Sequence, residues 1–279
     1  MFLTSLLLAS TPLAPLPGAI SSTLQDRRAE VQASYAALHE ARDEEGLAKL
    51  WSENMGLVLQ TIDADLEGGL ALWEAAPEDP PRERITALHA RALFGARVAA
   101  EALDRPLLHD YAISFTGWTD AQKGAFRAGQ AVYARGLEEL ENENLEVALL
   151  AGRETVERAL PLGDWWGTAM GYSLAGSAHQ ATGSFEDALA SYSMARTLHH
   201  GLGLEHSEYE ALQGMLNVLR ALERHPRARV VANDIIEYAR GFQDSATLKR
   251  TLSARAQIES ALGMTEEESA TRAELAAIE

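Results

Sequence analysis

An acidic stretch in the first third of the chain carries carboxylates at the spacing of a calcium-binding loop. Asp63, Asp65, Glu67 and Glu74 occupy the first, third, fifth and twelfth positions of such a loop, and Gly68 occupies the sixth. Carboxylate oxygens at these positions surround Ca²⁺, and the glycine permits the sharp turn that the loop needs. The spacing therefore makes a calcium site of the EF-hand type one reading of this stretch.

The apolar residues of the same stretch favour a different structure. Leu59, Ile62, Leu66 and Trp73 continue a helical stripe through the loop positions, and Pro77 would cut off the second helix that an EF-hand requires. We therefore expect a solvated acidic helix here, with calcium binding as the alternative.

Histidines form the second cluster with possible chemistry. His199, His200 and His206 crowd one interhelical turn and have the residue type to share a zinc ion. No carboxylate stands at a fixed spacing beside them, so surface histidines are the expectation and a metal the alternative. His179 falls on a buried stripe, where we expect a core residue bonded to a neighbouring helix.

Trp165 and Trp166 are adjacent and would point about 100° apart on a helix. We therefore expect one of them in the core and the other at a contact surface.

Composition excludes several functional classes. The chain has 24 basic and 41 acidic side chains, a net charge of -17, so nucleic acid and anionic membranes are poor partners. It has no cysteine, which removes disulfides, thiol nucleophiles and cysteine-held metals. No phosphate loop, GxSxG, HExxH or dinucleotide motif is present, and no convincing alternating strands occur. We therefore predict no enzymatic activity, no cofactor and no metal.

The first 21 residues have the pattern of a secretory signal peptide. They are apolar, carry no charged side chain, contain prolines at 12, 15 and 17, and end in small residues that suit cleavage. A disordered tail or an uncleaved anchor are alternatives, although the prolines interrupt the run short of a spanning helix. The prediction is an exported protein, periplasmic or extracellular in a bacterial envelope, with no membrane insertion after cleavage.

The elements that would position any site are helices throughout. Over residues 22–118 we expect one stripe of apolar residues near residue 35 and a longer one from Leu47, ended by Pro80 and Pro81. A further helix fits residues 82–102, and residues 105–118 form a short helix or connector. We place a domain boundary there, so that residues 22–118 form an N-terminal helical region and residues 119–279 a second domain.

The most regular stretch is residues 169–200, which reads as two helices joined by a turn at 182–184. Gly176, Ala188 and Ala195 are small enough to let two helices approach closely, and Tyr192 fills the space beside them. Each helix has a stripe that a single pair cannot bury, so further hairpins must stack on this one.

This stretch resembles a tetratricopeptide repeat. The small residues and aromatics of that family match Gly176, Ala188, Tyr192 and Ala195, and its turn glycine matches Gly183. This chain departs from the family at three positions, where it has Ala175 in place of leucine, His179 in place of tyrosine and His200 in place of proline. The resemblance covers residues 119–278 at most, and it implies an α-solenoid whose first helices line a concave peptide-binding groove.

The spacing of the helix starts supports a repeat. Second helices are expected near Asn144, Ser184, Pro226 and Thr265, which are 40, 42 and 39 residues apart, typical of a long-helix variant of this repeat. We expect Ser184 to cap its helix, and we expect capping boxes at Thr119, Ser207 and Thr265.

Carrying the groove positions of the family onto this chain gives a mostly polar set on three first helices. It comprises Met170, Ser173, Ser177 and Gln180; then Glu210, Gln213, Asn217 and Arg220; and finally Arg250, Ser253, Gln257 and Ser260. The amides and hydroxyls suit a peptide backbone, and Arg220 with Arg250 suits a carboxylate.

The sequence thus predicts an all-α solenoid that binds a partner protein or peptide in a polar groove. One alternative is a structural accessory subunit that self-associates or joins an envelope complex through other faces. Another is a metal-dependent or catalytic helical domain.

Overall fold

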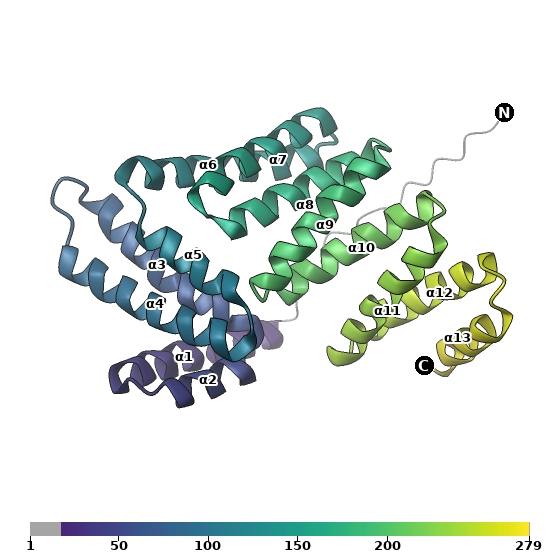
Figure 1. Ribbon diagram of the computed structural model, residues 1–279, viewed down its shortest axis with the longest axis horizontal. Coiled ribbons are helices and arrows are strands. Elements are labelled where there is room, and N and C mark those ends of the chain that lie inside the picture. The colour runs from purple at the N-terminus through teal and green to yellow at the C-terminus, as the bar shows by residue number, and fades with distance from the viewer. Residues whose placement is uncertain (1–17, 279) are drawn as a thin grey trace.

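The described part of the chain is all-α and solenoid-like, as the sequence predicts. The computed structural model describes residues 18–278, with side chains from residue 25 onward; these residues are 86% helical and include thirteen α-helices and no strand (Figure 1). Apart from the first turn of α1, the predicted signal peptide over residues 1–21 lies outside the described residues. Among the described helices, none is at once long and apolar enough to cross a bilayer.

The N-terminal region contains five helices and one short 3-10 turn. They are α1 (Gly18–Ala41), α2 (Glu44–Glu53), η1 (Met55–Leu57), α3 (Val58–Ala75), α4 (Arg82–Leu103) and α5 (Pro106–Thr116). Pro80 and Pro81 lie between α3 and α4, but α3 already ends at Ala75, two residues before Pro77, because proline lacks the N–H that a continuing helix needs. The long stripe predicted from Leu47 is divided in two, since α2 ends before η1 and α3 begins after it.

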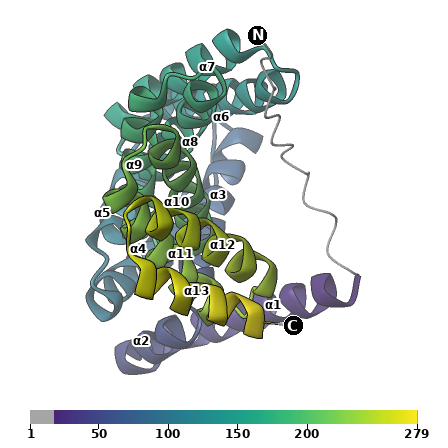
Figure 2. The same ribbon diagram turned by 90° about the vertical axis from the view of Figure 1, so that its right-hand side faces the viewer.

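The remaining helices are stacked as antiparallel hairpins. They are α6 (Asp120–Glu141), α7 (Leu145–Ala159), η2 (Leu160–Leu162), α8 (Trp165–Ala181), α9 (Phe185–Gly201), α10 (Glu205–Ala221), α11 (His225–Gly241), α12 (Ser245–Ala261) and α13 (Thr265–Ala277). Each helix packs on the next, and α8 also contacts α6 and α10, so the first helices of neighbouring hairpins adjoin. In Figure 2 the same helices follow one another from α6 and α7 at the top to α13 at the bottom.

The turns between these helices recur every 20 residues. Each contains one residue with positive φ, at Glu143, Gly163, Gly183, Gly203, Glu223, Gln243 and Gly263. In each turn the next N–H bonds to a carbonyl five residues earlier, for example Ser184 to the carbonyl of His179 at 2.9 Å, which is the Schellman pattern that ends a helix. Helices α8 to α12 are each 17 residues long, and α7, α9, α11 and α13 begin 40 residues apart, at the predicted places.

Not every predicted cap is formed. The capping box at Thr119 and Gln122 is confirmed, but Ser184 stands at the N-cap without a side-chain cap bond. The predicted boxes at Ser207 and Thr265 are wrong, because Ser207 lies inside the first turn of α10 and Thr265 is already the first residue of α13. The positive-φ turn residue sets where these helices begin, so a side-chain cap is not needed to define the start.

One apolar core extends across the N-terminal region and into the hairpins. It runs from Val31 to Leu204 and includes Trp118 and Phe126, which lie on the two sides of the proposed boundary at 118/119. A second core, from Ala188 to Ile258, joins α9 to α12. The hairpins are therefore packed directly against the N-terminal helices.

The predicted close approach of helices around Tyr192 is present. Ala188 and Ala195 are fully buried, and Tyr192 is 7% exposed. A Cβ atom built on Gly176 would lie 2.8 Å from the Tyr192 ring, and one built on Gly214 would lie 2.5 Å from it. The ring thus fills the space that two glycines leave between α8, α9 and α10.

Candidate functional site

The predicted groove positions on α10 and α12 meet in one hollow of about 290 Å³. Its floor includes Leu216 and Ile235, and six of the predicted groove residues line it: Gln213, Asn217, Arg220, Arg250, Ser253 and Gln257. These residues are far apart in sequence but share one surface because α10 and α12 are the first helices of adjacent hairpins.

The two arginines of the hollow are held by amides rather than by carboxylates. Arg220 Nη2 donates to Gln257 Oε1 at 2.7 Å, and Arg250 Nη2 donates to Gln213 Oε1 at 3.1 Å. Neither guanidinium forms an ion pair with a carboxylate of the described residues. Both positive charges therefore remain available to an anionic group.

The predicted groove positions on α8 do not line this hollow. Ser173 Oγ lies 3.1 Å from His199 Nε2, and Ser177 Oγ accepts a bond from the Tyr192 hydroxyl at 3.3 Å. Gln180 has a buried Oε1 without a partner among the described residues, and Met170 lines a different cavity.

Two other predicted groove positions are also outside the hollow. Glu210 is exposed, and its Oε1 lies 3.5 Å from His206 Nε2. Ser260 is exposed on the last turn of α12. Of the twelve predicted positions, the structure thus gathers six around the hollow, three of the four on α10 and three of the four on α12.

The acidic stretch with calcium-loop spacing is part of a continuous helix. The helix α3 runs through all of it, from Val58 to Ala75, so the EF-hand loop is not formed and the expected helix is confirmed. The expectation that its acidic side chains are solvated is wrong, because Asp65 is buried and Asp63 and Glu67 are partly buried against neighbouring helices. Asp65 is buried and ion-paired with Arg91, whose Nε donates to Asp65 Oδ2 at 2.7 Å.

Arg127 of α6 holds two further carboxylates of that stretch, Glu67 and Glu74. Its Nη2 donates to Glu67 Oε2 and its Nε to Glu74 Oε1, both at 2.7 Å. These bonds raise the pKa of Arg127, and the bond to Glu74 is the largest cause of that rise. The bond from Arg127 lowers the pKa of Glu74. The carboxylates of α3 therefore serve to attach α4 and α6 to α3.

The four histidines predicted as surface or core groups lie in different surroundings. The expectation of a surface residue is wrong for His199, which is 2% exposed because it lies against α8, and burial lowers its pKa to about 4. His200 is exposed and lies 2.9 Å from Glu208, while His206 pairs with Glu210, which raises the His206 pKa. His179 is buried as expected, but its Nδ1 has no partner among the described residues, so the predicted bond is not found for that nitrogen.

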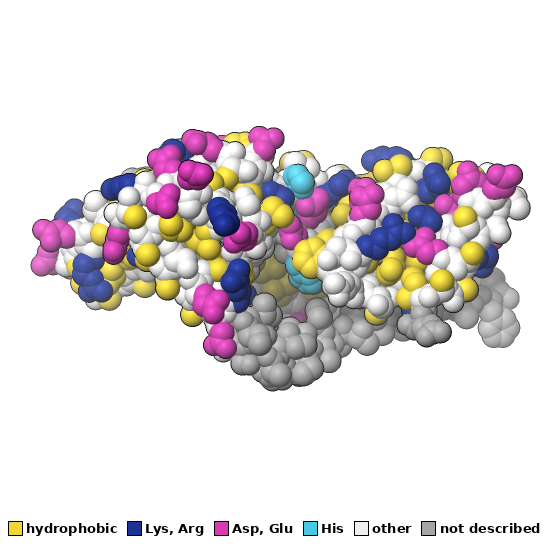
Figure 3. All heavy atoms as spheres, turned by 90° about the horizontal axis from the view of Figure 1, so that it is seen from below, with side chains coloured by type: hydrophobic (Ala, Val, Ile, Leu, Met, Phe, Trp, Pro, Cys, Tyr) yellow, Lys and Arg dark blue, Asp and Glu magenta, His cyan; other side chains and the backbone are white. Residues whose placement is uncertain are grey.

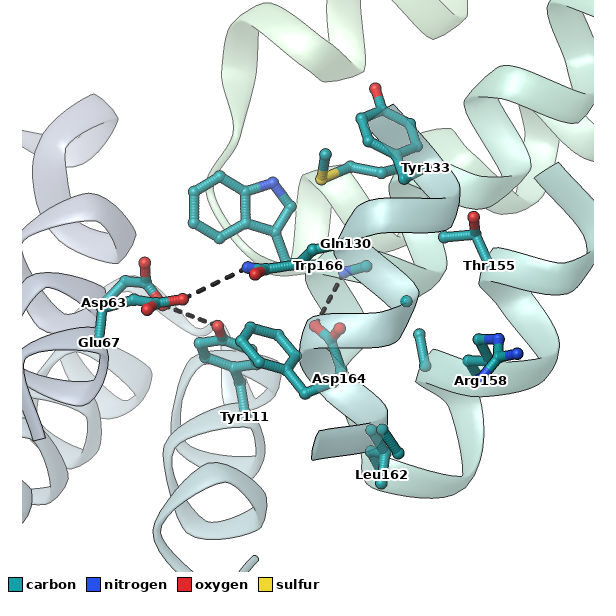
Figure 4. Close-up of a pocket in the computed structure, with 16 residues that line it drawn as sticks. Asp63, Glu67, Tyr111, Gln130, Tyr133, Thr155, Arg158, Leu162, Asp164 and Trp166 are labelled. Carbon is teal, nitrogen blue, oxygen red and sulfur yellow. Dashed lines mark hydrogen bonds between the residues drawn. The ribbon is translucent and has the colours of Figure 1, made fainter. Parts of the chain in front are cut away.

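A larger cavity, of about 310 Å³, lies where α3 and α5 meet α6, α7 and α8 (Figure 4). Apolar side chains make up most of its wall, among them Phe126, Leu162, Trp166 and Met170. On one side lie the carboxylates Asp63, Glu67 and Asp164, and the hydroxyl of Tyr111. Apolar walls with a few convergent polar groups are typical of small-ligand sites.

Local structure holds both aspartates in place. The hydroxyl of Tyr111 donates to Asp63 Oδ1 at 2.8 Å. Asp164 is 5% exposed and caps α8, with the N–H of Gly167 donating to its Oδ1 at 2.8 Å. It follows the positive-φ residue Gly163, which ends η2.

Burial changes the acid–base properties of these groups. Desolvation raises the pKa of Asp63 to about 7, although the bond from Tyr111 acts in the opposite direction. Desolvation likewise raises the pKa of Asp164 to about 6, against the effect of the Gly167 N–H. Both carboxyls thus titrate near neutral pH, which is common at functional sites.

Sequence reasoning did not find this cavity. The calcium-loop spacing draws attention to Asp63 alone, and Asp164 lies 101 positions further along the chain (164 minus 63). Trp166 lines the cavity, while both Trp165 and Trp166 are partly buried and pack on the first core, so the expected division between core and contact surface is not seen. The sequence feature that could have indicated this cavity is the run from Gly163 to Trp166.

A scan against models of known protein families found no match to this chain, and a search of curated proteins found none either.

Proposed function

We propose that this chain is an exported interaction protein that binds an acidic segment of a partner protein or peptide in the hollow between α10 and α12. The resemblance to tetratricopeptide repeats supports a concave peptide site on the first helices of the hairpins. The observation that carries the proposal is the pair of guanidinium groups, Arg220 and Arg250, that face one hollow without carboxylate partners among the described residues.

The chemistry of the hollow suits a peptide with a carboxylate. A guanidinium can donate two parallel bonds to a carboxylate, and such charge-assisted bonds are stronger than neutral ones. Gln213 and Gln257 use their oxygens to accept from the arginines, so their NH₂ groups are left to donate to peptide carbonyls. Leu216 and Ile235 provide an apolar floor for a neighbouring side chain.

Charge also favours this hollow over other surfaces for an anion. The whole chain carries a net charge of -17, which repels acidic peptides in general. In Figure 3 basic and acidic side chains are interspersed over the part of the surface formed by the C-terminal helices, so binding there depends on local groups.

The proposal is tested by a charge reversal with a matched control. Arg220→Glu places a negative charge in the hollow, whereas Arg227→Glu makes the same change on an exposed position of α11 that does not line it. Native protein and both variants are used to capture partners from an envelope fraction, and affinities are measured for any peptide mapped from them.

Loss of one charge-assisted bond costs about 1.5–3 kcal/mol, so Arg220→Glu should weaken binding at least about tenfold. Arg227→Glu should leave it within about twofold. Equal binding by the native protein and Arg220→Glu would show that the hollow is not the binding site.

Self-association through the second helices is a further candidate, because these helices expose large apolar side chains. Leu150 of α7 is 57% exposed and Val230 of α11 is 61% exposed, and they are related by two repeats of 40 residues. Phe242, just after α11, is 57% exposed. Sedimentation of the native protein beside Val230→Lys tests this candidate, since a self-associating form should dissociate in the variant.

A further inference from the structure

The cavity between α3, α5, α6, α7 and α8 has a charge imbalance that is independent of the α10–α12 hollow. Of its three carboxylates, Glu67 is neutralised by Arg127, which also binds Glu74. The one arginine in the wall, Arg158, is paired with Glu154 one turn earlier on α7. Neither of these guanidiniums forms an ion pair with Asp63 or Asp164.

Asp63 and Asp164 are therefore carboxylates without a cationic partner among the described residues. Asp164 is 5% exposed and lines the cavity, and its Oδ2 has no donor among the described side chains and backbone groups. A charge in such a place is costly unless it is neutralised. The molecule keeps two such groups on one wall.

The rest of the wall indicates what kind of cation would enter. Phe126 and Trp166 present aromatic surface, and Leu162, Ala159 and Met170 add aliphatic surface. Aromatic faces attract organic cations, and apolar walls stabilise a stem rather than a hydrated ion. Among the described residues no group of three His, Asp or Glu side chains is placed to hold one metal ion.

We propose that this cavity binds an organic cation, an ammonium or guanidinium group on an apolar or aromatic stem, with the charge against Asp63 and Asp164 and the stem against Phe126 and Trp166. The volume of about 310 Å³ is at the lower end of ligand pockets, which suits a small amine or a single Lys or Arg side chain of a peptide.

The raised pKa values of the two carboxyls add a pH dependence. The other ionisable groups at this wall or near it are Glu67 and Glu74 of α3, Tyr111 of α5, Arg127 and Tyr133 of α6, and Arg158 of α7. A cation binds the ionised carboxylates, whose pKa values are about 7 for Asp63 and about 6 for Asp164. Binding should therefore be at least about tenfold stronger at pH 8 than at pH 5, since an alkylamine stays protonated across that range.

The experiment is calorimetric titration of the full chain with phenethylamine, its neutral isostere 2-phenylethanol, and CaCl₂. Asp63→Asn and Asp164→Asn keep the oxygens that accept from Tyr111 and Gly167 while removing the charge. Asp110→Asn removes the same charge from an exposed position of α5 outside the cavity, and it is the matched control. Melting curves check that each variant is folded.

We expect phenethylamine to bind, 2-phenylethanol to bind about 10- to 100-fold more weakly, and each cavity variant to lose a similar factor for the amine. Asp110→Asn should bind like the native protein. A blocked Gly-Lys-Gly peptide distinguishes the sources: binding of this peptide without binding of the free amine assigns the site to a peptide side chain. Equal binding of amine and alcohol, an unchanged affinity in both cavity variants, displacement of the amine by calcium, or no binding of either the amine or the peptide would each overturn the proposal.

Discussion

A single methyl group added at Gly214 tests the stacking on which the hairpin array depends. The Cβ of Gly214→Ala would lie 2.5, 2.6 and 2.7 Å from three ring atoms of Tyr192, which is 7% exposed. The ring cannot move aside freely, because Gly176 of α8 leaves only the space that the ring occupies and the hydroxyl bonds to Ser177. The substitution therefore overfills the contact between α9 and α10.

The expected magnitude combines two opposing effects. Overpacking of a well-packed core costs typically about 1–3 kcal/mol, and three contacts below 3.0 Å place this site in the upper part of that range. Alanine is better than glycine in a helix by about 1 kcal/mol. The net expectation is a loss of about 1–2 kcal/mol for Gly214→Ala. Gly124→Ala in α6 has nothing within 4 Å of its new Cβ and should gain about 0.5–1 kcal/mol.

Urea unfolding followed by far-ultraviolet circular dichroism measures both variants. In a Tyr192→Ala background the clash is absent, so Gly214→Ala should become neutral or stabilising there. If Gly214→Ala is as favourable as Gly124→Ala in the native background, α9 and α10 do not pack in this register and the reasoning fails.

Two further predictions concern buried charge. Because burial raises the pKa of Asp164 to about 6, this carboxyl keeps its proton to a higher pH in the native state than in the unfolded state. The stability that the protonated group contributes to the native state is fully present below about pH 4 and is lost as pH rises through 6. Asp164→Asn should therefore gain stability relative to the native protein between pH 4 and 7, by up to roughly 3 kcal/mol, and a difference that does not change with pH in urea titrations would contradict this. Removing the partner of Asp65, whose side chain is 3% exposed, leaves a buried unpaired carboxylate, so Arg91→Ala should cost about 3 kcal/mol. Arg97→Ala, which breaks a partly exposed pair with Glu44, should cost under about 1 kcal/mol in the same unfolding assay, and similar costs for the two variants would refute the assigned burial.

The parts of the fold that were predictable are those encoded over short distances in the chain. The α3 stripe and the Pro80-Pro81 break are read from neighbours a few residues apart, and both were found. The second helices begin where the sequence placed them because each turn ends one helix locally, through a positive-φ residue and its Schellman bond. The capping predictions at Ser207 and Thr265 failed because the same turn already determines the helix start.

The candidate site residues also differ in how far the sequence predicts their surroundings. The tetratricopeptide resemblance implies one surface for Gln213 and Arg220 with Arg250 and Gln257, and the structure places them around one hollow. The resemblance implies the same surface for Ser173, yet the Ser173 hydroxyl contacts the buried His199 of the next helix. A repeat register specifies which side of a helix a residue occupies, but not which neighbours cover that side.

The sequence by itself determined the helical class and the period of the turns, because each depends on patterns within one or two turns of helix or on a repeated turn. Only the tertiary structure decided that α3 and α5 close against the hairpins, and that Asp63, Tyr111 and Asp164 meet at one cavity wall. The physical reason is that burial, and with it the pKa and the available charge of a side chain, is set by helices that are distant in the chain.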